Sequence, residues 1–326
     1  MSSDFWNDKR IMITGITGFA GSWLAEKLLE KHEIEIFGLR RERSSLENIA
    51  HLKDKMTLVN GDILEMDSLL AALKESEPDV VFHLAAQALA KIGYDEPFKT
   101  FSLNFTGTMN MMDAIRRYDR KITKIHFASS SNVYGYVKPE EIPVNEKQEI
   151  KPFEMYGISK ASADSLCRSY SNAYGMPIVV TRAFHHEGPR CNKGVIGMEI
   201  VQQISNAIKG LTKTLSFGNI DVTRDFSDVR DIVNGYLLAI EKGRNGEVYN
   251  LCSGKGYKIR NLINEIIKEF QLEGISIETD PKRLRRKDMP VMVGDNSKAK
   301  KELGWEIERE FKNTLVELIN HNVKRI

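Results

Sequence analysis

The sequence predicts an α/β fold, with a doubly wound parallel sheet and a smaller, partly interleaved C-terminal lobe. Two observations lead to this prediction. Short apolar runs alternate with segments of helical spacing from residue 10 to residue 184, and strands this apolar belong to parallel sheets that are covered on both faces. The first apolar run also ends in a glycine-rich turn, GITGFAG, that opens the first helical segment. This strand-turn-helix order is typical of doubly wound folds.

The elements of this pattern follow one another without an internal repeat. The first three are a strand in RIMITG (10–15), a helix in SWLAEKLLEK (22–31) and a strand in IEIFGLR (34–40). Short apolar runs that end in turn residues indicate strands, and apolar residues three and four apart indicate helices. The alternation continues through strand 56–62, helix 67–76, strand 79–86, a helical stretch from about Pro97 to Arg117, strand 124–130, helix 157–174 and strand 177–184.

The pattern loosens after Phe184. A helix is expected near 197–209, and a turn-rich segment follows it. Helix 229–242 and strand 247–253 resume the earlier style, so we expect them to return to the first sheet. The remaining elements are helix 258–270, strand 276–280, the basic segment PKRLRRK and a closing helix at 310–322. We therefore expect residues 1–182, rejoined by about 225–253, to form the first lobe, and residues 183–326 to form the second.

Composition and charge exclude several classes of protein. The chain of 326 residues is 41% apolar and 28% charged, which is ordinary for a globular protein. Its net charge of +2 gives no field that would attract nucleic acid. The three cysteines, Cys167, Cys191 and Cys252, are too few for a disulfide framework or a metal cluster and suit a reducing compartment. We expect a cytoplasmic protein with neither a signal peptide nor a membrane span.

The glycines of GITGFAG are Gly15, Gly18 and Gly21, between the first strand and the first helix. Glycine at such positions lets the backbone turn tightly and approach a pyrophosphate, while the helix N-terminus supplies N–H donors and a positive dipole. The sequence therefore predicts a dinucleotide site. The spacing departs by one residue from Gly-x-Gly-x-x-Gly, so this is not the version found in simple hydroxy-acid dehydrogenases.

The end of the second strand bears on the choice of dinucleotide. An acidic residue there would receive the ribose 2′-hydroxyl of NAD, whereas an arginine accommodates the 2′-phosphate of NADP. This chain has GLRRERSS, with Arg40, Arg41 and Arg43, which favours NADP(H). NAD(H) remains an alternative, and a solvated charge run would explain the same short pattern.

Two segments of the sequence contain candidates for proton transfer and for orienting the reacting oxygen. Tyr156 and Lys160, in YGISK, are four residues apart and share one face of a helix. A tyrosine is a poor base at neutral pH, but a neighbouring ammonium and a nicotinamide cation both favour its phenolate. In FASSSNVYG the serines follow a strand, and a hydroxyl at its carboxyl end would point into the ligand crevice. We choose Ser130 among the three; the alternative is an ordinary serine-rich turn.

Several segments together resemble the extended short-chain dehydrogenase/reductase family that modifies nucleotide sugars. They are TGITGFAGSWLAEKLL, GDI at 61–63, HLAAQ at 83–87, SSSNVYG, YGISKASAD and RDFSDVRDIV. The front half, especially RRERSSLENIAHL, looks like the GDP-mannose 4,6-dehydratases, and the back half looks more like the GDP-4-keto-6-deoxy-mannose reductases. The resemblance implies a Rossmann-type domain, a sugar-nucleotide lobe and a homodimer or homotetramer.

The resemblance also implies site residues. The catalytic residues fall on Ser130, Tyr156 and Lys160. The substrate residues fall on Asn104, Ser131, Asn132, His185, Arg190, Arg224 and Arg285. The cofactor residues fall on Gly15, Thr17, Gly18, Phe19, Gly21, Arg40, Asp62, Ile63, Leu84, Ala85, Ala86 and Gln87, with Tyr156 and Lys160.

Two of these positions depart from the family pattern. His185 stands where relatives often have asparagine, and a histidine pair in a loop is more often polar lining than a metal site. We expect no metal. The dehydratases commonly carry a glutamate at the position of Asn132, which helps to remove water across C5 and C6 by protonating the departing hydroxyl. An amide has no proton to give, so dehydration is weakened, unless another acid such as Glu187 compensates.

We therefore expect an NAD(P)-dependent enzyme that oxidises or reduces C4 of a GDP-linked mannose-type sugar, in the first place a 4-keto reductase. The alternatives are a GDP-sugar 4,6-dehydratase, a nucleotide-sugar C4 epimerase and a non-catalytic dinucleotide-sensing protein. The sensor is disfavoured because Tyr156 and Lys160 are both present.

Overall fold

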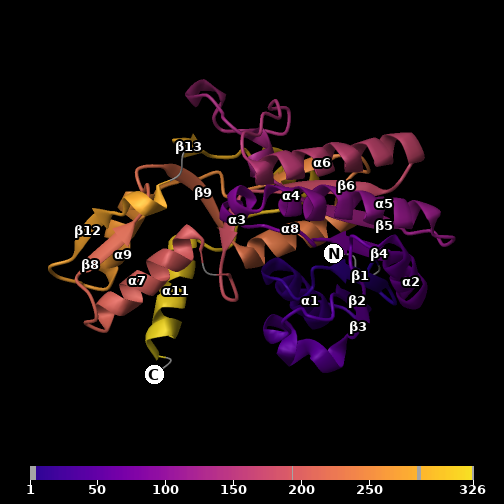
Figure 1. Cartoon of the computed structure of the whole chain (residues 1–326), viewed down its shortest axis with the longest axis horizontal. Helices are drawn as coiled ribbons and strands as arrows, with labels where there is room; N and C mark the ends of the chain where they lie inside the picture. Colours follow the sequence, from indigo (N-terminus) through magenta and orange to yellow (C-terminus); the bar gives the residue numbers. More distant parts are fainter. Residues whose placement is uncertain (1–4, 193, 285–287, 325–326) are drawn as a thin grey trace.

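The larger lobe is built on a seven-stranded parallel sheet. The computed structural model describes residues 5–192, 194–284 and 288–324 (Figure 1). The strand order is β10-β6-β5-β4-β1-β2-β3, and every neighbouring pair is parallel. The strands are β1 (Arg10–Thr14), β2 (Glu35–Arg40), β3 (Thr57–Asn60), β4 (Val80–His83), β5 (Lys124–Ser130), β6 (Ile178–Ala183) and β10 (Val248–Leu251). The predicted doubly wound α/β fold is confirmed.

Helices cover both faces of this sheet. Strand β1 alternates between them: Ile11 and Ile13 pack in one apolar core, and Met12 packs in the other. The first core is covered by α1 (Phe19–Lys31) and α8 (Val229–Lys242). The second is covered by α2 (Met66–Ser76), α5 (Gly107–Arg117) and α6 (Met155–Tyr174). Because both faces are buried, the strands read as continuous apolar runs.

The strand order reverses between β1 and β4. From β1 the chain moves outward through β2 and β3, then crosses to β4 and continues through β5 and β6 on the other side. Ligands of doubly wound sheets bind at the carboxyl ends of the strands on either side of such a reversal. In this chain those ends carry the glycine turn after β1 and residues 84–87 after β4.

Short helices connect β4 to α5, and short 3-10 turns flank β3 and β5. Helices α3 (Ala90–Asp95) and α4 (Pro97–Phe101) precede a π-helical turn, Ser102–Thr106, that leads into α5. The sequence predicted one helical stretch over this region, and the π turn is where that stretch changes its winding. The 3-10 turns are Glu47–Lys55, Ser131–Tyr134 and Pro139–Glu141.

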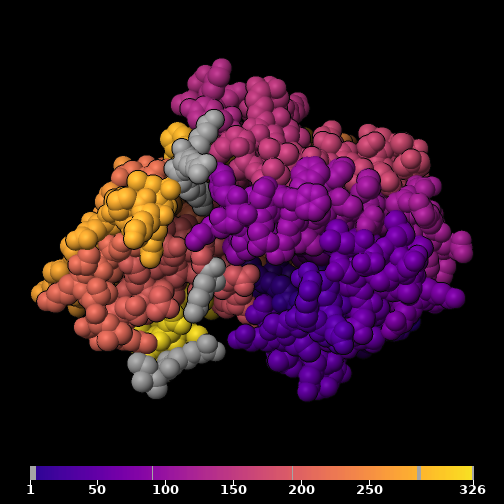
Figure 2. Space-filling view, in the orientation of Figure 1, coloured from indigo at the N-terminus to yellow at the C-terminus, as the bar shows by residue number. Residues whose placement is uncertain are grey.

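The smaller lobe has its own core. Strand β9 (Thr223–Asp228) pairs with β7 (His185–Glu187), β11 (Gly256–Lys258) and β13 (Val291–Met292). Strands β8 (Thr214–Phe217) and β12 (Ser276–Thr279) form a second, two-stranded sheet, followed by a 3-10 turn at Pro281–Arg283. Helices α7 (Ile196–Ile208), α9 (Ile259–Glu269) and α11 (Phe311–Lys324) pack on these strands. Figure 2 shows the orange and yellow residues of this lobe gathered beside the indigo and magenta residues of the larger one.

The two lobes are interleaved along the chain. After the first strands of the smaller lobe, α8 returns to pack against α1, and β10 pairs with the outer edge of β6. Helix α10 (Ser297–Leu303) returns as well, because it packs on α8 and β10. Trp305 follows it into the core of the larger lobe, where its indole donates to the carbonyl of Asp231 at 2.8 Å. The division near residue 182 stays a prediction.

No helix in the described part of the chain is long and apolar enough to cross a membrane.

Candidate active site

The turn after β1 is shaped to approach a phosphate group. Gly15 has φ +74°, and a Cβ at Gly21 would lie 2.3 Å from the carbonyl oxygen of Gly15, so α1 packs against the turn at a distance that only glycine allows. Gly18 is the N-cap of α1, and no side chain caps the helix there. The first N–H groups of α1 therefore remain available to a pyrophosphate.

The flanking residues connect this turn to other parts of the chain. The carbonyl of Thr17 accepts a hydrogen bond from Asn48 at 3.1 Å. The ring of Phe19 stacks on His186, with 6.1 Å between ring centroids. Strand β7, which follows β6, therefore lies next to the start of α1.

The arginines after β2 line a hollow beside the start of α2. Its lining comprises Arg41, Glu42, Arg43, Asn60, Gly61, Asp62 and Glu65. Arg40 donates to the carbonyl of Glu42 at 3.2 Å, and its buried Nε has no partner among the described residues. The hollow contains two guanidinium groups, those of Arg41 and Arg43, and three carboxylates. The guanidinium groups suit the oxygens of a phosphate, and a carboxylate can accept from a ribose hydroxyl. Asp62 itself accepts from the backbone of Leu64 at 3.0 Å, and Ile63 is buried directly after it.

Residues 84–87, after β4, lie beside the glycine turn, because a Cβ on Gly15 would be 2.9 Å from the backbone nitrogen of Ala85. The backbone N–H of Ala85 donates to Thr14 at 3.2 Å, so the segment starting at Leu84 and continuing through Ala86 runs next to the glycine turn. Gln87 donates its backbone N–H to Asn104 at 2.8 Å. Asn104 in turn donates to the carbonyl of Gln87 and to Ser159. Both the oxygen and the nitrogen of the Asn104 amide are therefore hydrogen-bonded, and Asn104 connects residues 84–87 to α6.

The end of β5 and the start of α6 bring the three predicted catalytic residues together. Tyr156 and Lys160 come from the first two turns of α6, and Ser130 is the last residue of β5. The hydroxyl of Tyr156 is hydrogen-bonded to Ser130. Burial lowers the pKa of Lys160 to about 8. The ammonium donates to the carbonyl of Ala128 and lies 4.6 Å from the ring centre of Phe127.

Comparisons with known proteins show the family to which the chain belongs. The family model of GDP-mannose 4,6 dehydratase matches residues 12–318. The chain is 32% identical to the GDP-6-deoxy-D-mannose reductase of Pseudomonas aeruginosa over 98% of both chains. It is 30% identical to a GDP-mannose 4,6-dehydratase of Vibrio cholerae, over 98% of this chain and 95% of that one.

The chain belongs to the GDP-mannose 4,6-dehydratase family.

Solved structures agree with this assignment. The RMD structure from Pseudomonas aeruginosa, complexed with NADPH, has a TM-score of 0.82 at 30% identity, over 98% of this chain and 99% of that one. A UDP-glucose 4-epimerase from Thermotoga maritima, with UDP-glucose, has a TM-score of 0.85 at 27% identity, over 96% and 99%. The larger lobe is thus a Rossmann-type domain, and the chain is an NAD(P)-dependent enzyme of the short-chain dehydrogenase/reductase class.

The three consecutive serines at and just after the end of β5, residues 129–131, have different environments. Ser129 donates to the buried carboxylate of Asp164 at 2.7 Å. Asp164 also holds Arg182 through two hydrogen bonds of 2.9 Å each. Ser130 alone bonds Tyr156, whereas Ser131 is buried in the following turn. The sequence contained a signal for Asp164, because it lies four residues after Lys160 and so on the same helix face.

The structure places an acid beside Asn132 that the sequence analysis did not consider. The amide of Asn132 donates to Glu154 at 2.5 Å, and the Glu154 side chain is buried. Glu187, which the sequence analysis named as a compensating acid, accepts from the backbone N–H groups of Gly197 and Met198 at the start of α7. Burial raises the pKa of Glu187 to about 7. The carboxylate of Glu187 is thus used at the start of α7. Glu154, by contrast, is bonded directly to Asn132, in the turn that follows Ser130.

The predicted substrate residues of the second lobe lie in different settings. His185, on β7, packs edge-on against Phe226. Arg224, on β9, pairs with Asp288 at 2.6 Å and is largely buried. Arg190 pairs with Glu26 and lies over the Trp23 ring at 4.1 Å, so it contacts α1. Arg285 lies outside the described residues.

Among the described residues, no group of three or more histidine, cysteine, aspartate or glutamate side chains is placed to hold a metal ion.

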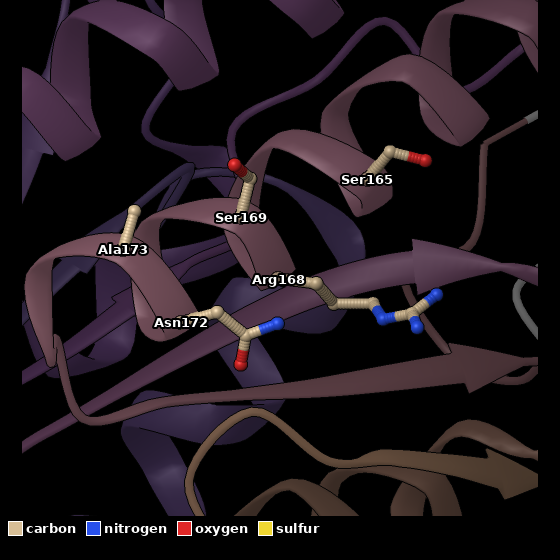
Figure 3. Close-up of a pocket in the computed structure, with 5 residues that line it drawn as sticks. All are labelled: Ser165, Arg168, Ser169, Asn172 and Ala173. Atoms are coloured by element: carbon tan, nitrogen blue, oxygen red, sulfur yellow. The ribbon is translucent and has the colours of Figure 1, made fainter.

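A hollow on the outer surface of α6 is separate from the catalytic group (Figure 3). It is lined by Ser165, Arg168, Ser169, Asn172 and Ala173, all from the C-terminal half of the helix. These side chains are exposed, whereas Lys160 is buried on the same helix. None of the predicted site residues lines this hollow.

Proposed function

We propose that this enzyme is a reductase of the 4-keto group of a GDP-linked, mannose-type sugar, with NADPH as the hydride donor. The observation that carries the proposal is the Ser130 and Tyr156 pair next to Asn132. A carbonyl reduction needs a proton donor and an orienting hydroxyl, and this pair provides both. The similarity to the Pseudomonas aeruginosa reductase along the whole chain supports the same choice.

The residues around the dinucleotide site fit NADPH. The uncapped N-terminus of α1 would hold the pyrophosphate, and Arg40, Arg41 and Arg43 would hold the 2′-phosphate. When bound, this group supplies hydride to C4 of the sugar. Lys160 would bind its nicotinamide ribose, and its ammonium would also favour the charge that develops on Tyr156.

The chain's own residues supply the proton. Ser130 orients the C4 oxygen, and Tyr156 donates its phenolic proton to that oxygen as hydride arrives at carbon. Asn132 stands where a dehydratase would need an acid to protonate the departing C6 hydroxyl. Its amide supplies hydrogen bonds but no proton. Hydride chemistry at C4 does not depend on that acid.

The test is an incubation of purified enzyme with NADPH and a GDP-4-keto-6-deoxy sugar. Nicotinamide absorbance and sugar mass are followed together. We expect stoichiometric loss of NADPH and a product heavier by two hydrogen atoms. If NADPH is not consumed, the reductase proposal is wrong.

A 4,6-dehydratase is the second candidate, because Glu154 adds a carboxylate next to Asn132. The same mass assay on GDP-mannose tests it, since dehydration removes the mass of one water. An unchanged mass with altered chromatography would instead indicate an epimerase.

The arginines after β2 lead to a prediction about the cofactor. Arg41→Ala removes a guanidinium from the hollow beside Asp62. A hydrogen bond to a charged group contributes about 1.5–3 kcal/mol. We therefore expect KM for NADPH to rise by about 10- to 100-fold, with little change in KM for NADH. Initial rates with both cofactors measure this, and Arg117→Ala, at the exposed end of α5, is the matched control. Equal effects on NADPH and NADH would contradict the assignment of a 2′-phosphate site.

The proposal also assigns a ligand to each lobe of the chain. Residues 1–182 with about 225–253 would bind the dinucleotide, and the rest of 183–326 would bind the sugar nucleotide. A homodimer or homotetramer and a cytoplasmic location also stay predictions.

A further inference from the structure

Glu154 is the N-cap residue of α6, but its side chain does not cap that helix. An acid at a helix N-terminus ordinarily accepts from the free N–H groups of the first turn. Here the carboxylate turns instead toward the end of β5 and accepts from the amide of Asn132 at 2.5 Å. Only 8% of Glu154 is exposed. Because a buried carboxylate is costly unless it is hydrogen-bonded, this amide accounts for the position of the charge.

The turn that holds Glu154 also holds the catalytic tyrosine. The backbone N–H of Asn132 donates to Ser130 at 3.2 Å, and Ser130 bonds Tyr156. The start of α6 is packed tightly on this turn, because a Cβ on Gly157 would lie 2.7 Å from the carbonyl oxygen of Asn132. The carboxylate and the phenol are therefore both fixed to one short segment, Ser130–Asn132. Neither can move away without breaking a contact with it.

Few charges act on Tyr156 in this position. Burial raises the pKa of Tyr156 to about 12, the hydrogen bond from Ser130 lowers it, and the charge of Glu154 raises it. The ammonium of Lys160 is held on the carbonyl of Ala128. Tyr236 on α8 interacts with Tyr156. His126 on β5 and His83 on β4 are close enough to Lys160 for its charge to affect them. Helix α3 packs on Tyr156 through Gly93, and its charged residues Lys91 and Asp95 are exposed. Burial lowers the pKa of each of these two histidines to about 3, so both are neutral near pH 7.

We propose that Glu154 is a positioning residue that fixes a negative charge beside Tyr156 and so favours the protonated phenol, the form that a ketone reduction consumes. This inference rests on the proposed function. In the reduction, a C–H bond forms at C4 as the nicotinamide is oxidised. The O–H bond of Tyr156 breaks, its proton goes to the C4 oxygen, and water later reprotonates the phenolate. The reverse oxidation needs the phenolate from the start, so the same charge opposes it. The equilibrium between the two sugars is unaffected.

Glu154→Gln tests the proposal, because glutamine keeps an oxygen that can accept from Asn132 and removes only the charge. Removing a nearby negative charge lowers the pKa of Tyr156, so the phenol is lost at lower pH. We expect the alkaline limb of kcat/KM for reduction to move down by on the order of one pH unit. Below that limb, we expect the reverse oxidation with NADP+ to become faster by up to about tenfold. Glu154→Asp, which keeps the charge, should restore most of the original profile.

A second measurement needs no sugar substrate. Tyrosinate absorbance is titrated in the NADP+ complex, and the same titration of the Tyr156→Phe variant is subtracted to isolate Tyr156. We expect the Tyr156 transition at lower pH in Glu154→Gln. We expect no change in Glu149→Gln, which removes an exposed carboxylate paired with Lys151 at the surface. Coincident titrations of Glu154→Gln and the original chain would overturn the inference, even if the variant were less stable. The two proposals can fail separately. If the Tyr156 transition shifts in Glu154→Gln but the enzyme does not consume NADPH with the keto sugar, the proposed function is wrong and the effect of Glu154 on Tyr156 still holds.

Discussion

Tyr156→Phe is expected to lower kcat for the reduction by about 10²- to 10⁴-fold, the usual contribution of a positioned general acid. The substitution removes only the hydroxyl that bonds Ser130. The ring that packs at the start of α6 remains, so binding of NADPH should be nearly unchanged. Single-turnover rates of NADPH oxidation measure the chemical step, and fluorescence titration of NADPH measures binding. The same loss should appear in both directions of the reaction.

Tyr174→Phe is the matched control for this experiment. Tyr174 lies at the other end of α6, is 57% exposed, and contacts Tyr170 and Arg116 through its ring. Removal of the Tyr174 hydroxyl should leave kcat unchanged. A Tyr156→Phe enzyme that retains its kcat would contradict the mechanism, because the proton of the C4 hydroxyl would then have to come from another group.

Asp164→Asn is expected to destabilise the protein by about 3–5 kcal/mol, the range found when one member of a buried ion pair is removed. Asp164 and Arg182 have side chains that are 0% and 1% exposed. The carboxylate accepts two hydrogen bonds from Arg182 and one from Ser129. The amide cannot balance the guanidinium charge, so Arg182 would be left charged and buried. Thermal and urea unfolding, followed in parallel, measure the loss.

The control for this prediction is Asp113→Asn. Asp113 pairs with Arg116 and Arg117 on the exposed side of α5, and exposed ion pairs contribute little to stability. The loss should therefore be far smaller than for Asp164→Asn. Similar losses in the two variants would mean that the buried pair is not what holds the end of β5 in place.

Local patterns were enough to predict most of the sheet and its helices. Helix α8 has the predicted bounds, and β5 matches the predicted strand, because each is a strongly patterned run with clear ends. The strands of the smaller lobe were mostly missed. Strands β7, β11 and β13 have two or three residues each, and a run that short has no readable period. Their pairing with β9 comes from tertiary packing, which a local pattern does not contain.

The residues of the candidate site also fall into those that local sequence patterns predicted and those that only the fold brings together. Ser130, Tyr156 and Lys160 lie together, as their spacing and strand-end position predicted. Glu154 was missed because an acid just before a helix ordinarily indicates an N-cap, and only the fold reveals that its side chain turns to Asn132. Arg190 could not be placed from sequence either. Its partner Glu26 is 164 positions away along the chain, and loop arginines suit many ligands equally well.

The return of β10 to the edge of β6 has a consequence for the synthesis of the chain. When residue 183 has just left the ribosome, β6 has an unpaired edge, and the apolar face that α8 will cover is still open. An unpaired apolar edge strand is a template for pairing with another chain. Residues 229–251, which close both openings, leave the ribosome only several seconds later at ordinary elongation rates. The nascent chain therefore passes through an interval in which its first lobe is nearly complete but this edge and face are uncovered, and in that interval it is most exposed to pairing with other chains.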